Sequence, residues 1–141
     1  MPEKKTLRAA REDAKEGKAP TTQAGEFVRE EIEHIREGKH GARSAKQAIA
    51  IGLSKARRAG IKLPPPKKGR ASEATRIQAE RDLEKGVKRP NAKPSSKRSR
   101  ATETALKREG RSAASPKALS KQAKQAASAR KRRGKVTGSK T

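Results

Sequence analysis

The stretch GEFVREEIEHIREGKHGARSAKQAIAIGLSKARRAG, residues 25–60, is the part of the chain richest in large apolar side chains. Its first half predicts an amphipathic helix over residues 22–37, which begins at a Thr cap and ends at Gly38. Apolar residues recur there at spacings of three and four, so we expect them to face a core: Ala24, Phe27, Val28, Ile32 and Ile35. The acids of this helix, among them Glu30, Glu31 and Glu33, are expected on a solvated face.

The second half of the stretch predicts another helix over residues 44–59. Ser44 and Gln47 have the spacing of a capping box, and Gly60 followed by a Pro64 turn ends the helix. Its apolar stripe contains many small residues and should pack closely: Ala45, Ala48, Ile49, Gly52, Leu53 and Ala56. Four basic residues are expected to stay in water: Lys46, Lys55, Arg57 and Arg58. We therefore expect an antiparallel helical hairpin, and the small-residue face suggests self-association with another helix.

Composition limits how much of the chain can share this core. Of 141 residues, 38% are charged, 29% hydrophobic and 1% aromatic, so most of the second half cannot offset the entropy cost of ordering. The expected fold class is all-α, a small helical hairpin plus a largely disordered, conditionally helical basic tail. The expected parts are a short helix within residues 1–19, the hairpin in residues 20–63, and a tail over 64–141 with short helices near 72–85, 102–109 and 116–133. Residues 87–99 are expected to be a linker between the first two of these.

Charge is distributed unevenly along the chain. Residues 1–60 hold 14 Lys and Arg against 9 acids, a net of +5, whereas residues 61–141 hold 25 against 6, a net of +19. Such a tail needs a polyanion, so nucleic acid is the first expected partner and an anionic membrane surface the second. No apolar leader or membrane span is evident, and there is no cysteine, so we expect a cytoplasmic, nucleoid-associated protein.

The mode of nucleic-acid binding can be narrowed by the scarcity of aromatic residues. Phe27 is the only one, so base stacking is not expected, and a DNA duplex or structured RNA backbone is the preferred target. Two basic clusters are expected to contact phosphates: Lys67, Lys68 and Arg70, and Lys117, Lys121, Lys124, Arg130, Lys131, Arg132 and Arg133. A helix-turn-helix is not expected from the hairpin, because it offers few side chains for base edges and no clear bracing third helix.

Catalytic chemistry is not expected. His34 and His40 are the only histidines and look like ordinary polar residues of the hairpin surface and turn, and no ligand cluster has metal-binding spacing. No glycine-rich phosphate loop is present. We expect no enzyme activity, no cofactor, no metal and no small-molecule substrate.

Two resemblances follow from particular motifs. The segments KHG at residues 39–41 and KQAIAIGLSKARRAG at 46–60 resemble a family of small basic bacterial proteins of unknown function. That resemblance implies a bacterial origin, carries no catalytic residues, and covers roughly residues 20–66. The tail segments AKPSSKRS, SPKA and ASARKRRGK resemble the C-terminal domains of linker histones and related bacterial histone-like proteins.

These observations lead to one expected function and two alternatives. The expected function is non-sequence-specific, histone-like DNA binding through the basic tail, with the hairpin serving assembly. A ribosome- or RNA-associated basic factor is the first alternative. The second is a protein-interaction module, similar to an antitoxin or adaptor, with a basic anchor.

Overall fold

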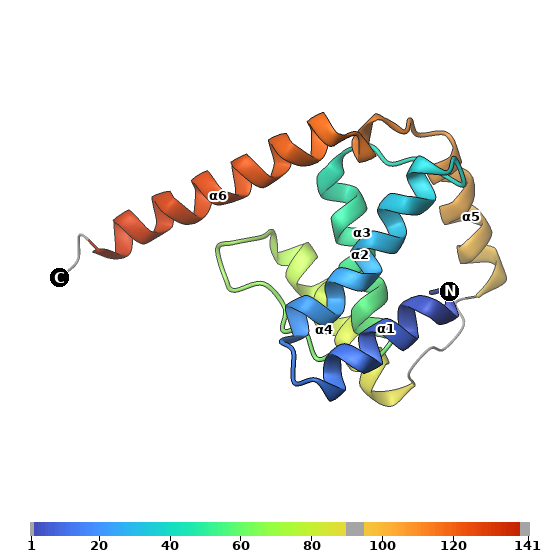
Figure 1. Cartoon of the computed structure of the whole chain (residues 1–141), viewed down its shortest axis with the longest axis horizontal. Coiled ribbons are helices and arrows are strands. Elements are labelled where there is room, and N and C mark those ends of the chain that lie inside the picture. Colours follow the sequence, from blue (N-terminus) through green and yellow to red (C-terminus); the bar gives the residue numbers. More distant parts are fainter. Residues whose placement is uncertain (1, 90–94, 139–141) are drawn as a thin grey trace.

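The computed structural model describes residues 2–89 and 95–138, with side chains described as far as Arg132. Within these residues the chain is all-helical, with six α-helices, one short 3₁₀ turn and no strand (Figure 1). The elements in chain order are α1 (Lys4–Lys15), α2 (Pro20–Arg36), α3 (Ala45–Arg58), α4 (Glu73–Lys88), α5 (Ser96–Lys107), η1 (Ser112–Ala114) and α6 (Pro116–Gly138). The predicted all-α class is confirmed for these residues.

Helices α2 and α3 form the centre of the fold as an antiparallel pair. The N terminus of α3 is capped as predicted, because the Ser44 hydroxyl accepts a hydrogen bond from the Gln47 N–H at 3.1 Å. The Gln47 side chain reaches back to the N–H of Arg43 at 2.6 Å, one residue before the usual capping-box partner. Gly52 brings the two backbones together, since a Cβ at this position would lie 2.6 Å from the Cα of Val28.

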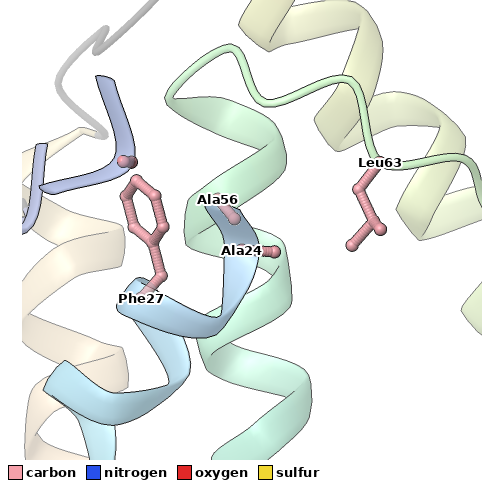
Figure 2. Packing of buried hydrophobic residues seen from close by; sticks show 5 residues of the cluster. Ala24, Phe27, Ala56 and Leu63 are labelled. Carbon is pink, nitrogen blue, oxygen red and sulfur yellow. The ribbon is translucent and has the colours of Figure 1, made fainter. Parts of the chain in front are cut away.

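Two further helices cover this pair, α1 against α2 and α4 against α3. One apolar cluster joins α1, α2, α3 and the segment after α3 through Ala10, Ala24, Phe27, Ala56 and Leu63. Figure 2 shows the Phe27 ring pointing from α2 toward α1, while Ala24 and Ala56 meet between α2 and α3. A helix on each side of the central pair explains how a chain with one aromatic residue closes a core.

Polar side chains hold α4 on α3. Asp82 is 1% exposed and accepts hydrogen bonds from Ser54 Oγ at 2.6 Å, Arg58 Nε at 2.9 Å and Gln78 Nε2 at 3.0 Å. Arg57 is buried beside this contact and donates to the carbonyl oxygens that follow α3, at Leu63 and Pro64. Burial lowers the pKa of the Arg57 guanidinium, and the charge of Asp82 partly offsets that effect.

The expectation that the basic residues of α3 stay in water is therefore wrong for Arg57. Arg58 keeps 45% of its side chain exposed but is paired with Asp82. Lys55 is 28% exposed and is paired with Glu31 of α2. Acids on the neighbouring helices draw these cations inward, which hydropathy does not reveal.

The second half of the chain does not form one separate tail, because α4 and η1 pack against the central helices. Gly86 of α4 lies against the backbone of Arg57, and Ala113 and Ala114 of η1 are buried with Ile35 and Ala48. The α5 helix is capped by Ser95 and begins at Ser96, earlier than the helix predicted near 102–109. Part of the predicted linker, residues 90–94, lies outside the described residues.

Helix α6 extends away from the body (Figure 1). Its first turn is capped by Ser115, whose hydroxyl accepts from the Ala118 N–H at 3.1 Å. Its tertiary contacts are with η1 and α3, and the remainder of the helix projects away (Figure 1). Among the described helices, none has the length and apolar character needed to cross a bilayer.

Candidate nucleic-acid interface

The projecting helix α6 gathers the predicted C-terminal phosphate contacts on one face. At about 100° per residue, five basic side chains fall within an arc of about 100°, and all of them are exposed: Lys117, Lys121, Lys124, Lys131 and Arg132. Ser128 lies within this arc, Ser120 and Gln125 lie at its two edges, and all three line the same shallow surface. Small polar residues in these positions leave the basic side chains free to reach outward.

Two predicted contacts do not share this face. Arg130 is exposed but lies on the opposite side of α6 by the same helical count. Arg133 belongs to α6, and its side chain lies outside the described residues. The basic face is therefore narrower than the sequence cluster suggests.

The acids of the chain end before this helix begins. Glu109 is the last one in the sequence, so α6 contains no carboxylate that could pair with its Lys and Arg residues. By contrast, α4 pairs Lys88 with Glu84 at 2.7 Å, and α5 pairs Lys107 with Glu103 at 3.2 Å. The positive charge of α6 is thus left for an outside anion.

The second predicted cluster lies on the loop between α3 and α4. Lys67, Lys68 and Arg70 are all exposed there. The loop is tied down on either side of this cluster, by Arg57 on the Pro64 carbonyl at 3.0 Å and by Arg76 on the Pro66 carbonyl at 3.1 Å. In Figure 1 the loop lies on the side of the body toward which α6 extends.

The residues assigned to packing and assembly lie in the interior of the helical body. Fully or nearly buried positions are Phe27, Ile35, Ala45, Ala48, Gly52 and Ala56, and half-buried positions are Val28, Ile32, Ile49 and Leu53. The small-residue stripe of α3 is covered by α2 of the same chain. It therefore offers no free surface for self-association.

One group of residues was misplaced by the sequence analysis. Glu30 and Glu31 are 2% and 0% exposed, so the expectation that they lie on a solvated face is wrong. His34 and His40 keep only 14% and 12% of their side chains exposed and lie beside these acids. A helical count could have found this group, since Glu31 and His34 follow Phe27 by four and seven residues and so share its face.

This buried polar group also holds the start of the chain. The Glu3 N–H donates to Glu30 Oε1 at 2.5 Å, and Glu3 Oε1 lies 3.0 Å from His34 Nε2. The hydrogen bond with His34, helped by one from Lys39, holds the pKa of the Glu3 carboxyl below its usual value. Of the described residues, Glu31, His34 and His40, or Glu3, Glu30 and His34, are arranged so that they could hold a metal ion.

Comparison with known proteins places the similarity in the body rather than in α6. A family model described as "Family of unknown function (DUF6496)" matches residues 4–68, which include α1, α2 and α3. This match agrees with the expected likeness to an uncharacterised family. No curated protein and no solved structure matches the chain.

Proposed function

We propose that the protein binds duplex DNA without sequence preference, as a histone-like, nucleoid-associated protein, through phosphate contacts from the basic face of α6. The observation that carries this proposal is a helix with five exposed basic residues on one face and no acid along its length. Each cation that replaces a condensed counterion on DNA gains free energy from counterion release. Lys and Arg contacts of this kind position a protein on phosphates without reading bases.

The dimensions of α6 suit a duplex. With 23 residues, it is about 34 Å long at 1.5 Å per residue, about one turn of B-DNA. An α-helix also fits the width of the major groove. The loop that carries Lys67, Lys68 and Arg70 would supply further phosphate contacts from the body.

We also propose that α6 gains helix on binding. Only the first part of α6 contacts the body. The helicity of the projecting part therefore relies on the helix propensity of its alanines, and repulsion between its like charges opposes it. Phosphates placed along the basic face would remove that repulsion. Far-UV circular dichroism should therefore show additional helix when duplex DNA is added at low salt.

The decisive experiment is a salt series with full-length protein and a short duplex. The five phosphate contacts of α6 alone predict a slope of about −4.5 for log K against log salt, which is about a 500-fold loss of affinity between about 50 and 200 mM, and contacts from the loop would steepen it. A face variant removes four of these contacts and should make the slope shallower by about 3.6, leaving the contribution of Lys131 and of the loop: Lys117→Gln, Lys121→Gln, Lys124→Gln and Arg132→Gln.

A matched control removes the same four charges from the exposed face of α1, where Lys and Arg occur at nearly the same spacing: Lys4→Gln, Arg8→Gln, Arg11→Gln and Lys15→Gln. This control should keep the wild-type slope. Equal losses in both variants would mean that net charge alone drives binding, and an unchanged slope in the face variant would overturn the proposal. Competition with folded RNA of equal length tests the target, because a preference for RNA beyond about tenfold exceeds what phosphate density explains.

A further inference from the structure

The buried polar group between α2 and the loop before α3 contains an unsatisfied carboxylate. Glu31 is 0% exposed, and its Oε1 accepts from the Lys55 ammonium. Its Oε2 is buried and has no hydrogen bond among the described residues. That oxygen lies 3.2 Å from Nε2 of His40, which comes from the loop.

The hydrogen bonding of His40 makes this contact informative. Nδ1 of His40 lies 2.9 Å from the Gly41 carbonyl oxygen, which can only accept, so Nδ1 carries a proton. In the neutral ring Nε2 is then an acceptor, and it faces a carboxylate oxygen that is also an acceptor. Two acceptors this close need a cation between them, either a proton on Nε2 or a metal ion. A ring whose second nitrogen donates to a backbone carbonyl is the usual arrangement of a metal-binding histidine.

His34 completes a set of three donors. Its ring stands edge-to-face with that of His40, with centroids 6.1 Å apart. Ligand atoms from Glu31, His34 and His40 all lie within 4.8 Å of one another. Tetrahedral zinc with bonds of about 2.0–2.1 Å separates its ligand atoms by about 3.3 Å, close to the 3.2 Å between His40 Nε2 and Glu31 Oε2.

We propose that Glu31, His34 and His40 bind a divalent first-row transition metal of the zinc class. Two imidazoles and one carboxylate favour zinc over magnesium or calcium, which prefer oxygen ligands. The chain has no cysteine, so no thiolate competes for the ion. The neighbouring carboxylate of Glu30 would add to the electrostatic attraction for a cation, because its Oε2 is also buried without a hydrogen bond.

The alternative set of Glu3, Glu30 and His34 is less suited. Glu30 Oε1 is already occupied by the Glu3 N–H and the Thr6 hydroxyl. Glu3 is 36% exposed and is shared with Lys5 and Lys39. This set also offers only one nitrogen donor, whereas the proposed site offers two.

Metal binding would fix the loop that supports the last part of the chain. Next to His40, the Gly41 N–H donates to the Leu106 carbonyl at 2.8 Å, and the Ala42 N–H donates to the Gly110 carbonyl at 3.0 Å. These bonds attach the last turn of α5 and the segment after it, which leads through η1 to α6. A metal at His40 would thus stabilise the base of α6, although the site itself does not depend on the proposed DNA binding.

The test uses full-length protein without a polyhistidine tag, titrated with Zn²⁺ and with Co²⁺ as a spectroscopic probe. We expect one ion per chain, visible absorption bands with the intensity of four-coordinate Co²⁺, and a rise in melting temperature with Zn²⁺. His34→Gln and His40→Gln should each weaken binding at least tenfold. Glu37→Gln is the matched control, since it removes an exposed acid from the end of α2 outside the cluster, and it should leave affinity unchanged.

A measurement on wild-type protein guards against variants that do not fold. The chain has only two histidines, so the ring nitrogen resonances of both can be followed by NMR as Zn²⁺ is added. Both rings should shift together and saturate at one equivalent. Absence of binding, binding of several ions that the histidine variants leave unchanged, or a shift of neither ring would each overturn the proposal.

Discussion

Replacing Gly52 with Ala tests the closeness of the α2–α3 contact on which the fold depends. The added Cβ would lie 2.6 Å from the Cα of Val28 and 2.9 Å from its N. Carbon atoms in contact normally stay about 3.5–4.0 Å apart. The two helices must therefore separate by roughly 1 Å, because the atoms of Val28 include backbone that cannot rotate away.

The expected free-energy change can be worked from two opposing terms. Overpacking a well-packed contact costs about 1–3 kcal/mol, and the upper end applies because a separation of this size weakens contacts along the whole pair. Replacing a helical glycine with alanine gains about 1 kcal/mol. We expect Gly52→Ala to lower the free energy of unfolding by about 2 kcal/mol and the melting temperature by roughly 4–8 °C.

Gly25 provides the matched control for this substitution. It lies in α2, is exposed, and a Cβ added there would meet nothing within 4 Å. Gly25→Ala should therefore raise the free energy of unfolding by about 0.5–1 kcal/mol. Urea unfolding followed by far-UV circular dichroism measures both variants. If Gly52→Ala proved as stable as the wild type, or if both variants were stabilised, the close approach of α2 and α3 would be wrong.

Two other contacts should respond in distinct ways. Asp82→Ala leaves three hydrogen-bond donors of α3 and α4 without their acceptor, so it should lower the free energy of unfolding in urea by about 3 kcal/mol. Glu84→Ala, two residues further along α4, is the control. It loses only an exposed ion pair with Lys88 and should leave stability unchanged. Equal effects of the two substitutions would contradict the docking of α4 through Asp82. Gly41→Ala would drive a Cβ into the backbone carbonyl of Glu109, so hydrogen exchange should speed up in η1 while α1 keeps its protection. Unchanged exchange in η1 would show that this segment does not rest on the loop.

The central helices could be predicted from the sequence because their signals are local. A cap requires only Ser44 and the N–H three residues later, and the helical period of the apolar residues in α2 is visible in the sequence itself. Boundaries expected at 22–37 and 44–59 compare with Pro20–Arg36 and Ala45–Arg58 in the structure. Such features form whatever packs around them.

The misplaced acids show why the remainder could not be predicted in the same way. A two-helix hairpin buries one face of α2, but α2 here lies between α1 and α3, so its buried arc is wider. On the side facing α1 the buried arc is polar, because Glu30 accepts hydrogen bonds from the Thr6 hydroxyl and the Glu3 N–H. Hydrophobic periodicity indicates which residues make apolar contacts, but it does not reveal buried contacts between polar groups.

The same limit explains why residues 64–141 looked like one tail. The α4 helix docks through Asp82, a charged residue, and η1 docks through Ala113 and Ala114, which are too small to raise the hydropathy of their segment. In the sequence, neither a single aspartate nor a pair of alanines distinguishes these segments from an exposed basic helix. The basic face of α6 differs in this respect, because a helical count along the sequence already shows which of its cations point the same way.

The positions of the acidic residues determine which helix has basic side chains that are free to contact phosphates in the proposed DNA binding. On α3, Lys55 is paired with Glu31, Arg58 with Asp82, and Arg57 is directed to backbone carbonyls. For α3 to enter a groove as a recognition helix, it would have to break these contacts and leave buried carboxylates without their partners, which is strongly unfavourable. Helix α6 contains no Asp or Glu, so it has no such ion pair of its own to break. DNA binding is therefore expected to leave the α1–α4 body intact, and hydrogen exchange in α3 should not change when duplex DNA is added.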